Sequence, residues 1–208
     1  MRARRKKWLS PYLESHPGLS FDSFSLDDPF LKEAPLYLEI GSGKGDFLLG
    51  ISKIEKGHYL GIEKVAQVVA IAEKKRAEEN NEDVRFLIAD IDFALEKLKD
   101  LRFKVIFLNF SDPWPKKCHA KRRLTYAPRL ERIISILDDN GELRIKTDNE
   151  GLYEFTLEQV EKLPLTQIYA TTDYSFDKEH DAMSEYERAF REEGKNIFRL
   201  IYKKEEQR

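Results

Sequence analysis

The chain has 208 residues, of which 41% are hydrophobic and 36% are charged. This length and composition suit one globular domain with a sizeable core, and they exclude a wholly disordered chain. The 36 basic and 38 acidic residues leave a net charge of −2, which by itself argues against a protein built to bind nucleic acid.

Cysteine and histidine usage excludes two further classes. Cys118 is the single cysteine, so no internal disulfide is possible, and the four histidines lack the spacing of a metal site. The basic start MRARRKKW precedes no apolar run typical of a signal peptide, and no apolar stretch is long enough for a membrane helix. We therefore predict a cytoplasmic protein without metal or membrane segment. The sequence makes no prediction of its oligomeric state.

Short apolar runs alternate with longer amphipathic runs from residue 35 onward. This alternation is typical of a mostly parallel α/β sheet. The predicted strands span 36–40, 58–63, 84–90, 103–110, 141–148, 165–173 and 196–204. The predicted helices span 46–54, 64–80, 92–100, 127–139, 151–163 and 185–194. We therefore predict one α/β domain over 35–208, preceded by a loosely attached basic N-terminal extension over 1–34.

The positive charge is concentrated in two clusters that contain no acid. The first cluster consists of Arg2, Arg4, Arg5, Lys6 and Lys7. The second consists of Lys116, Lys117, Lys121, Arg122 and Arg123. The first is equally consistent with a solvated tail. The second follows a predicted strand end, where functional loops gather, and is suited to grip RNA phosphates.

The first strand-to-helix turn is rich in glycine. It reads E-I-G-S-G-K-G, with Glu39, Gly41, Gly43 and Gly45. Glycines let the backbone turn tightly and approach a ligand, although they also serve to pack a helix on a strand. Because neither G-x-G-x-x-G nor G-x-x-x-x-G-K-[ST] is present, NAD and P-loop nucleotide sites are disfavoured. The spacing resembles the cofactor loop of S-adenosylmethionine-dependent methyltransferases.

Acids end the second and third predicted strands. Glu63 can accept hydrogen bonds from both ribose hydroxyls of an adenosyl group, and Asp90 lies where the amino edge of adenine would be reached. Each acid has a structural alternative, because Glu63 could favour the start of the next helix and Asp90 could cap 92–100.

The fourth predicted strand ends in N-F-S-D-P-W-P-K-K, where Asp112 and Trp114 precede the second basic cluster. Together with E-I-G-S-G-K-G, G-I-E, K-R-R-L and K-T-D-N, this motif resembles the bacterial tRNA (guanine-N7-)-methyltransferase family over residues 36 to about 200. The resemblance implies a Rossmann-like methyltransferase fold, with a mostly parallel twisted sheet, helices on both faces and an antiparallel last strand. It also implies S-adenosylmethionine as methyl donor and N7 of a guanine in the variable loop of tRNA as methyl acceptor.

The resemblance implies roles for individual residues. The cofactor and active site would be lined by Glu39, Glu63, Asp90 and Asp112. Contacts with tRNA would come from Lys116, from Asp148 and from the family's T-x-Y-E motif, present here as Ser184, Glu185, Tyr186 and Glu187. Serine keeps the hydroxyl of threonine but lacks its methyl group. Helix capping is the alternative for Asp148, with Asn149, and for the S-x-x-E pattern of Ser184 and Glu187.

Asp112 is the predicted catalytic residue. Guanine N7 carries an in-plane lone pair and no proton, so methyl transfer requires no general base at that atom, whereas the product ring is cationic. A carboxylate beside the ring can stabilise the developing charge or hold the base in register, while Trp114 limits where the base lies. The alternative is a plain turn at Asp112 and Pro113, with Trp114 as a core aromatic.

Two competing functions remain open at this stage. A methyltransferase acting on an exocyclic amine would carry an Asn/Asp-Pro-Pro-aromatic loop similar to S-D-P-W, although the K-K-x-H-x-K-R-R run favours the guanine interpretation. A non-enzymatic RNA-binding module would not require the glycines or Asp112.

Overall fold

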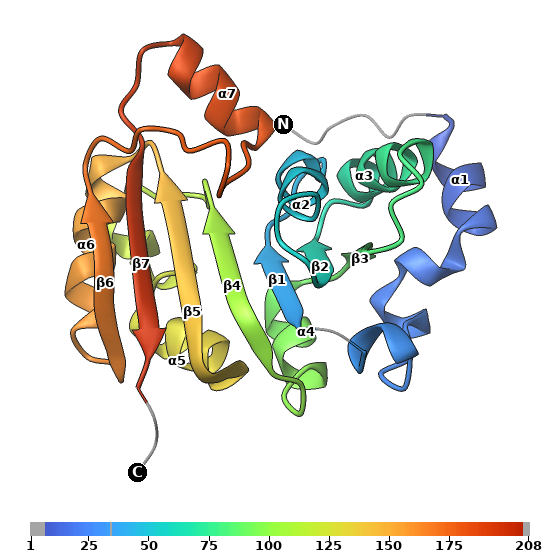
Figure 1. The fold of residues 1–208 in the computed structure, drawn as a ribbon, viewed down its shortest axis with the longest axis horizontal. Coiled ribbons are helices and arrows are strands. Elements are labelled where there is room, and N and C mark those ends of the chain that lie inside the picture. Colours follow the sequence, from blue (N-terminus) through green and yellow to red (C-terminus); the bar gives the residue numbers. More distant parts are fainter. Residues whose placement is uncertain (1–6, 34, 206–208) are drawn as a thin grey trace.

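The computed structural model describes residues 7–33 and 35–205. Its centre is a seven-stranded sheet with the strand order β3-β2-β1-β4-β5-β7-β6 (Figure 1). The strands are β1 (Leu36–Ile40), β2 (His58–Glu63), β3 (Val84–Ile88), β4 (Phe103–Asn109), β5 (Leu137–Thr147), β6 (Leu165–Thr171) and β7 (Phe198–Lys204). Neighbours among β1 to β5 pair in parallel, whereas β7 is antiparallel to both β5 and β6. The predicted mostly parallel sheet with an antiparallel last strand is confirmed.

Helix α1 (Leu9–Ser15) precedes the first strand, and the other α-helices connect successive strands. They are α2 (Asp46–Ile51), α3 (Ala66–Glu78), α4 (Ile91–Lys97), α5 (Ala127–Ser135), α6 (Glu150–Val160) and α7 (Glu185–Glu192). Short 3-10 helices are η1 (Pro17–Leu19), η2 (Phe21–Ser23), η3 (Pro29–Leu31) and η4 (Lys117–Arg122). The predicted helices correspond to α2 through α7. The second basic cluster, expected as a loop, contains η4.

Helices cover both faces of the sheet around β1, whereas the edge strand β6 is exposed along most of its length. Successive side chains of a strand point to opposite faces, so β1 sends Tyr37 into the core beneath α2 and α3 and Leu38 into the core beneath α4, α5 and α6. Every residue of β1 is buried as a result. A strand buried on both faces reads as a continuous apolar run, which explains the pattern seen in the sequence.

The N-terminal segment packs against the edge of the sheet beside β3 and α3 (Figure 1). Ser20 forms a parallel bridge with Ile88 of β3. Leu19 joins the core on one face, while Phe21 and Phe30 join the core on the other. Residues 7–33 thus pack on the sheet through apolar side chains that cover the β3 edge, and the division into an extension over 1–34 and a domain over 35–208 stays a prediction. The basic residues 1–6 lie outside the described residues.

The largest boundary difference lies between α5 and β5. The sequence predicts a helix to residue 139, but α5 ends at Ser135 and β5 begins at Leu137. Leu137 pairs with Phe103 before an irregularity in the β4–β5 register, and Gly141 follows Asn140, whose φ is +61°. Pairing with β4 thus overrides the local helical pattern.

Candidate active site

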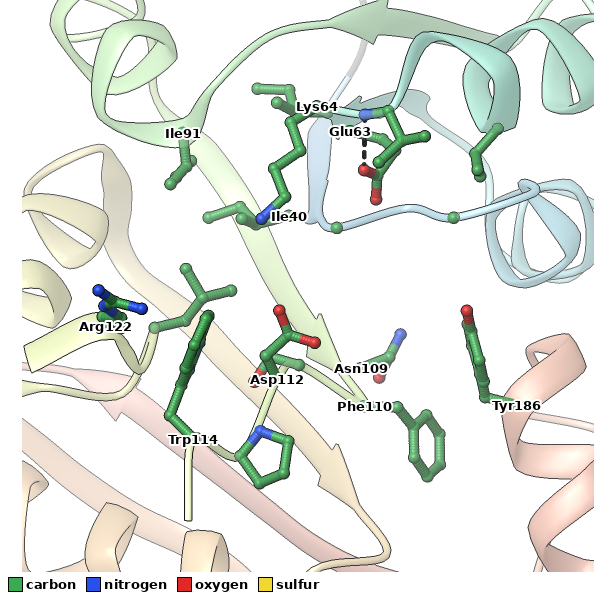
Figure 2. Close-up of a pocket in the computed structure, with 18 of the residues that line it drawn as sticks. Ile40, Glu63, Lys64, Ile91, Asn109, Phe110, Asp112, Trp114, Arg122 and Tyr186 are labelled. Atoms are coloured by element: carbon green, nitrogen blue, oxygen red, sulfur yellow. Dashed lines mark hydrogen bonds between the residues drawn. The ribbon is translucent and has the colours of Figure 1, made fainter. Parts of the chain in front are cut away.

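A cavity of about 750 Å³ opens at the carboxyl ends of the parallel strands, where ligands bind in sheets of this type (Figure 2). Its walls come from the loops after β1 to β5 and from α7. Among the predicted site residues, it is lined by Gly41, Gly43, Glu63, Asp90, Asp112, Trp114, Arg122, Asp148 and Tyr186. A smaller adjoining hollow is lined by Glu39, Gly45, Ser184 and Glu185, among others. The fold thus gathers at one place side chains that are far apart in sequence.

The glycine turn after β1 forms one wall. Gly41 has φ +81° and Gly45 has φ +81°, in the left-handed region that side chains rarely adopt. A Cβ added at Gly45 would lie 2.5 Å from the Phe86 ring, so α2 could not approach β3 as closely with any other residue. The turn therefore requires glycine for both backbone shape and packing.

Glu39 lies beneath this turn and is buried, with 2% of its surface exposed. Asn109, at the end of β4, donates its Nδ2–H to Glu39 Oε1 over 2.9 Å. Burial raises the pKa of the Glu39 carboxyl to about 8, although the Asn109 hydrogen bond and the nearby Lys146 cation act in the opposite direction. Glu39 Oε2 and Ser42 Oγ are buried without a hydrogen-bonding partner among the described residues. A bound donor would satisfy both oxygens.

Glu63 ends β2, Asp90 caps α4, and both acids face the cavity. Glu63 Oε1 accepts a hydrogen bond from the Val65 backbone N–H over 2.9 Å, and its carboxylate points into the cavity (Figure 2). Asp90 Oδ1 accepts from the Asp92 backbone N–H over 3.0 Å and is the N-cap of α4. The capping alternative is thus realised for Asp90, whereas α3 begins at Ala66 with Val65 as its N-cap and has no side-chain cap. Because only one oxygen of each carboxylate is used, both acids remain compatible with ligand binding.

The S-D-P-W-P loop after β4 brings Asp112 to the centre of the cavity (Figure 2). Asp112 is exposed, and its carboxylate accepts no hydrogen bond within residues 7–33 and 35–205. Phe110 and Trp114 adopt positive φ values of +52° and +41°, so the loop is held in an uncommon conformation. Trp114 is half-buried against the cavity rather than in the main core. Trp114 thus lines the cavity and belongs to neither hydrophobic core cluster, unlike the core aromatic of the alternative interpretation.

Arg123 holds this loop in place. Its Nε–H donates to the Pro113 carbonyl over 2.9 Å and its Nη2 to the Trp114 carbonyl over 3.1 Å. The same guanidinium lies 4.2 Å from the centre of the Phe155 ring. Arg122 stacks over Trp114 at 4.9 Å. The two arginines therefore belong to the architecture of the S-D-P-W-P loop, which differs from their expected place in a phosphate-gripping strip.

The lysines of the second basic cluster are arranged differently. Lys116, Lys117 and Lys121 are exposed around η4, and none of them forms an ion pair with any described acid. We call these three residues the lysine strip. Free cations on one side of a cavity are suited to contact an anionic polymer.

The K-T-D-N segment after β5 divides its roles between two residues. Asn149 is the N-cap of α6, since its Oδ1 accepts from the Leu152 backbone N–H over 2.8 Å. Asp148 lines the cavity and lies 3.4 Å from Lys195 Nζ. Capping therefore explains Asn149 but not Asp148.

The four residues of the S-E-Y-E motif lie in different environments. Ser184 caps α7 by accepting from the Glu187 backbone N–H over 3.1 Å. Glu185 pairs with Lys44 of the glycine turn over 2.7 Å, and Tyr186, 60% exposed, lines the cavity. Glu187 has no exposed surface, so the structure offers tRNA no direct contact with its carboxylate.

Comparison with known proteins agrees with this geometry. Residues 33–200 match the family model described as a putative methyltransferase. A tRNA (guanine-N(7)-)-methyltransferase of Limosilactobacillus reuteri is 39% identical over 209 residues, covering 97% of this chain and 98% of the relative. Another with that name, from Mesoplasma florum, is 41% identical over 222 residues and covers 98% and 99% of the two chains. The chain belongs to the tRNA (guanine-N(7)-)-methyltransferase family.

Solved structures support the fold of this family member. An S-adenosylmethionine-dependent O-methyltransferase from Thermotoga maritima matches with a TM-score of 0.57, covering 100% of this chain and 69% of that one. At 15% identity, this likeness concerns the fold alone. The predicted Rossmann-like methyltransferase fold is confirmed.

The cavity of this methyltransferase-family chain fits S-adenosylmethionine. The glycine turn leaves the backbone accessible, and Glu63 and Asp90 each keep one carboxylate oxygen available. Within residues 7–33 and 35–205, the buried Glu39 Oε2 and Ser42 Oγ have no hydrogen-bonding partner. Together these features match a ligand that carries ribose hydroxyls, an exocyclic amine and an ammonium group.

Sequence reasoning missed two residues that line the cavity and one buried residue near it. Asn109 and Phe110 both line the cavity, and their place directly before S-D-P could have identified them. Lys146, the lysine of K-T-D-N, is 4% exposed at the end of β5. A lysine in the mostly buried second half of a strand is a signal of a paired buried charge.

Two surveys of the described residues concern other classes of site. Among residues 7–33 and 35–205, no helix combines the length and apolarity needed to span a bilayer. The same residues contain no cluster of three or more His, Cys, Asp or Glu side chains arranged to hold a metal ion.

Proposed function

We propose that this protein transfers a methyl group from S-adenosylmethionine to N7 of a guanine in tRNA. The observation that carries the proposal is the position of Asp112, whose unpaired carboxylate lies in the cavity of a chain similar along nearly its whole length to tRNA (guanine-N(7)-)-methyltransferases. We place the target guanine in the variable loop of tRNA, as the sequence motifs imply. A tRNA substrate makes the cytoplasm the site of the reaction, and this localisation is part of the proposal.

The cofactor end of the cavity lies between the glycine turn and the acids after β2 and β3. S-adenosylmethionine, when bound, supplies an electrophilic methyl group. Glu63 accepts the ribose hydroxyls through the oxygen that the Val65 N–H leaves available, and Asp90 faces the amino edge of adenine. Glu39 and Ser42 offer oxygens without partners among the described residues to the ammonium group, whose positive charge would favour the ionised form of Glu39. These roles orient the ligand and move no proton to or from the methyl acceptor.

Asp112 serves the acceptor base. N7 carries no proton, so the residue acts by charge and position rather than as a general base. Its carboxylate stabilises the positive charge that develops on the guanine ring, or accepts hydrogen bonds from the guanine N1–H and amino group. Trp114 and Tyr186 lie on either side of Asp112 in the cavity and restrict where the base can lie (Figure 2).

The tRNA backbone is held outside the cavity. The lysine strip contacts phosphates on the side of η4, while Arg122 extends positive charge to the cavity wall. Asp148, Ser184 and Glu185 at the opposite side are the remaining candidates for contact with the substrate. Because phosphate contacts carry no base specificity, the cavity must select guanine.

Mass analysis of nucleosides tests the proposal. Unmodified tRNA is incubated with the enzyme and isotopically labelled S-adenosylmethionine, then digested, and labelled 7-methylguanosine is the expected product. A second tRNA with the variable-loop guanine replaced by adenine should yield no label. A product methylated on an exocyclic amine would favour the competing enzyme class, and the absence of both methylation and cofactor binding would favour an RNA-binding module.

A further inference from the structure

The connection between β6 and β7, residues 172–197, carries α7 over the sheet end that holds the cavity (Figure 1). Tyr186 reaches the cavity from this helix (Figure 2). A Cβ added at Gly43 would lie 4.0 Å from the Tyr186 ring, so the helix directly borders the glycine turn. The position of α7 therefore determines the shape of the cofactor end of the cavity.

The ion pairs that join α7 to the glycine turn and to the start of α2 are partly exposed. Lys44 pairs with Glu185 over 2.7 Å, with exposed fractions of 40% and 50%, and Arg188 pairs with Asp46 over 2.9 Å. Exposed ion pairs are worth little because water screens them and long side chains lose entropy. These contacts do not account for a fixed position of α7.

A buried cluster on the underside of α7 supplies a stronger connection. Lys146 Nζ, at the end of β5, lies 2.7 Å from Asp181 Oδ2, 2.9 Å from Glu187 Oε2 and 3.0 Å from the Ala182 carbonyl oxygen. The side chains of Lys146 and Asp181 are each 4% exposed, and that of Glu187 is 0% exposed. The three donors of the ammonium thus match three acceptors on the segment that begins α7.

Each acid in this cluster also forms an ion pair with an arginine. Arg199 pairs with Asp181 over 3.2 Å, and Arg191 pairs with Glu187 over 2.8 Å. Charge compensation of the two carboxylates therefore does not require Lys146. What Lys146 adds is a link that joins both pairs to the sheet.

A buried ionic cluster contributes little net stability, because desolvating the charges offsets their attraction. It does favour a single arrangement, since a displaced partner would leave a charge unpaired in the interior. We propose that Lys146 is a positioning residue for methyl transfer, whose buried ammonium holds the 181–187 segment and so keeps Tyr186 against the glycine turn. This inference rests on the proposed function.

The test compares full-length Lys146→Met with the parent protein. Calorimetry with S-adenosylhomocysteine should give a dissociation constant raised by about tenfold or more, the change expected when a group that closes the ligand site is displaced. The KM for S-adenosylmethionine should rise in parallel, whereas the dissociation constant for tRNA should not change, because the lysine strip lies elsewhere. Hydrogen exchange should accelerate in α7 but not in β1 or β4.

A matched control is Lys104→Met, which removes a lysine that pairs with Glu55 over 2.9 Å near the start of β4, at the opposite end of the sheet. Its cofactor affinity should equal that of the parent. Should Lys146→Met fail to fold, Asp181→Asn provides the milder variant, because it removes one charge and keeps the shape of the side chain. It should raise the cofactor dissociation constant in the same direction.

Parental cofactor affinity and parental exchange of α7 in these variants would overturn the inference. A lower melting temperature with an unchanged dissociation constant would also overturn it, since that result indicates a purely structural cluster. Absence of tRNA methylation by the parent would contradict the proposed function instead, and the binding and exchange measurements would still decide the role of Lys146.

Discussion

Asp112 differs from the other acids that surround the cavity. Glu63 and Asp90 each accept a hydrogen bond from the backbone N–H two residues later, and Asp148 lies near Lys195, whereas the Asp112 carboxylate has no such partner among the described residues. A carboxylate in this position can respond to charge on a ligand without first breaking a protein contact. This availability is what the proposed catalytic role requires.

The first prediction concerns the charge of Asp112. Asp112→Asn keeps the size of the side chain but removes its negative charge, so the single-turnover methylation rate should fall by about 10² to 10³-fold if electrostatic stabilisation dominates. Binding of tRNA, measured by filter retention, should persist. Asp139→Asn, at an exposed position near the start of β5, is the matched control and should methylate at the parental rate. A parental rate for Asp112→Asn would contradict the catalytic role.

The second prediction concerns Glu39, whose pKa in the folded protein is raised from 4.5 to about 8 by burial. Between these values the folded state holds a proton that the unfolded state has released. The free energy of unfolding contributed by this residue therefore falls as pH rises through that range. Relative to the parent, Glu39→Gln should gain stability as pH rises from 5 to 8, by up to a few kcal/mol.

Urea unfolding of both proteins at pH 5, 6, 7 and 8 measures this difference. A constant difference across the series would mean that Glu39 is ionised throughout. Glu63→Gln, which alters an acid with only part of its surface buried, is the control.

At the scale of single elements, the S-D-P-W-P loop depends on a residue that the sequence assigns to RNA. The third prediction is that Arg123→Gln slows single-turnover methylation by about tenfold or more, because it removes two hydrogen bonds from a charged donor to Pro113 and Trp114. The salt dependence of tRNA binding should stay parental. Lys121→Gln is the neighbouring control and should show the reverse pattern. A parental rate for Arg123→Gln would show that the loop keeps its shape unaided.

The elements themselves were predictable to different degrees. Strand β1 and the glycine turn were predictable from local sequence. The apolar run 36–40 predicts a buried strand, and the glycines that follow predict a tight turn. The start of β5 was not predictable, because the residues from Leu137 pair with β4, a contact distant in sequence. The N-terminal segment was missed for a similar reason, since Leu19 and Phe21 become buried only when the β3 edge exists.

The residues of the candidate site also differ in how far the sequence alone could predict them. Residues at strand ends, such as Glu63, Asp90 and Asp112, could be placed because parallel strands bring their carboxyl ends together. The structural roles of Glu187 and Arg123 could not be predicted, because both depend on tertiary contacts. Glu187 pairs with Lys146 of β5, and Arg123 donates to the Pro113 carbonyl of the S-D-P-W-P loop. A cluster of charged residues in the sequence shows only that these residues are neighbours in the chain. The tertiary structure decides which of their side chains stay available to bind RNA.

At the scale of the whole molecule, a net charge of −2 supplies no general attraction for RNA. Association must then depend on where the free cations lie. The lysine strip has three exposed cations without acidic partners among the described residues, and it borders the loop that carries Asp112. Local rather than global charge therefore brings tRNA to the cavity.

The last prediction tests this local field by replacing Lys116, Lys117 and Lys121 together with alanine. The affinity for tRNA should fall, and the slope of log affinity against log salt should flatten by up to about 0.7 to 0.9 for each phosphate that the protein no longer neutralises. The dissociation constant for S-adenosylhomocysteine should match that of the parent, because none of the three lysines lines the cavity. Lys53, Lys99 and Lys162, exposed lysines on other elements, are replaced together as the control for net charge. Equal flattening in both triple variants would mean that overall charge governs binding, and an unchanged slope in the strip variant would mean that tRNA lies on another face.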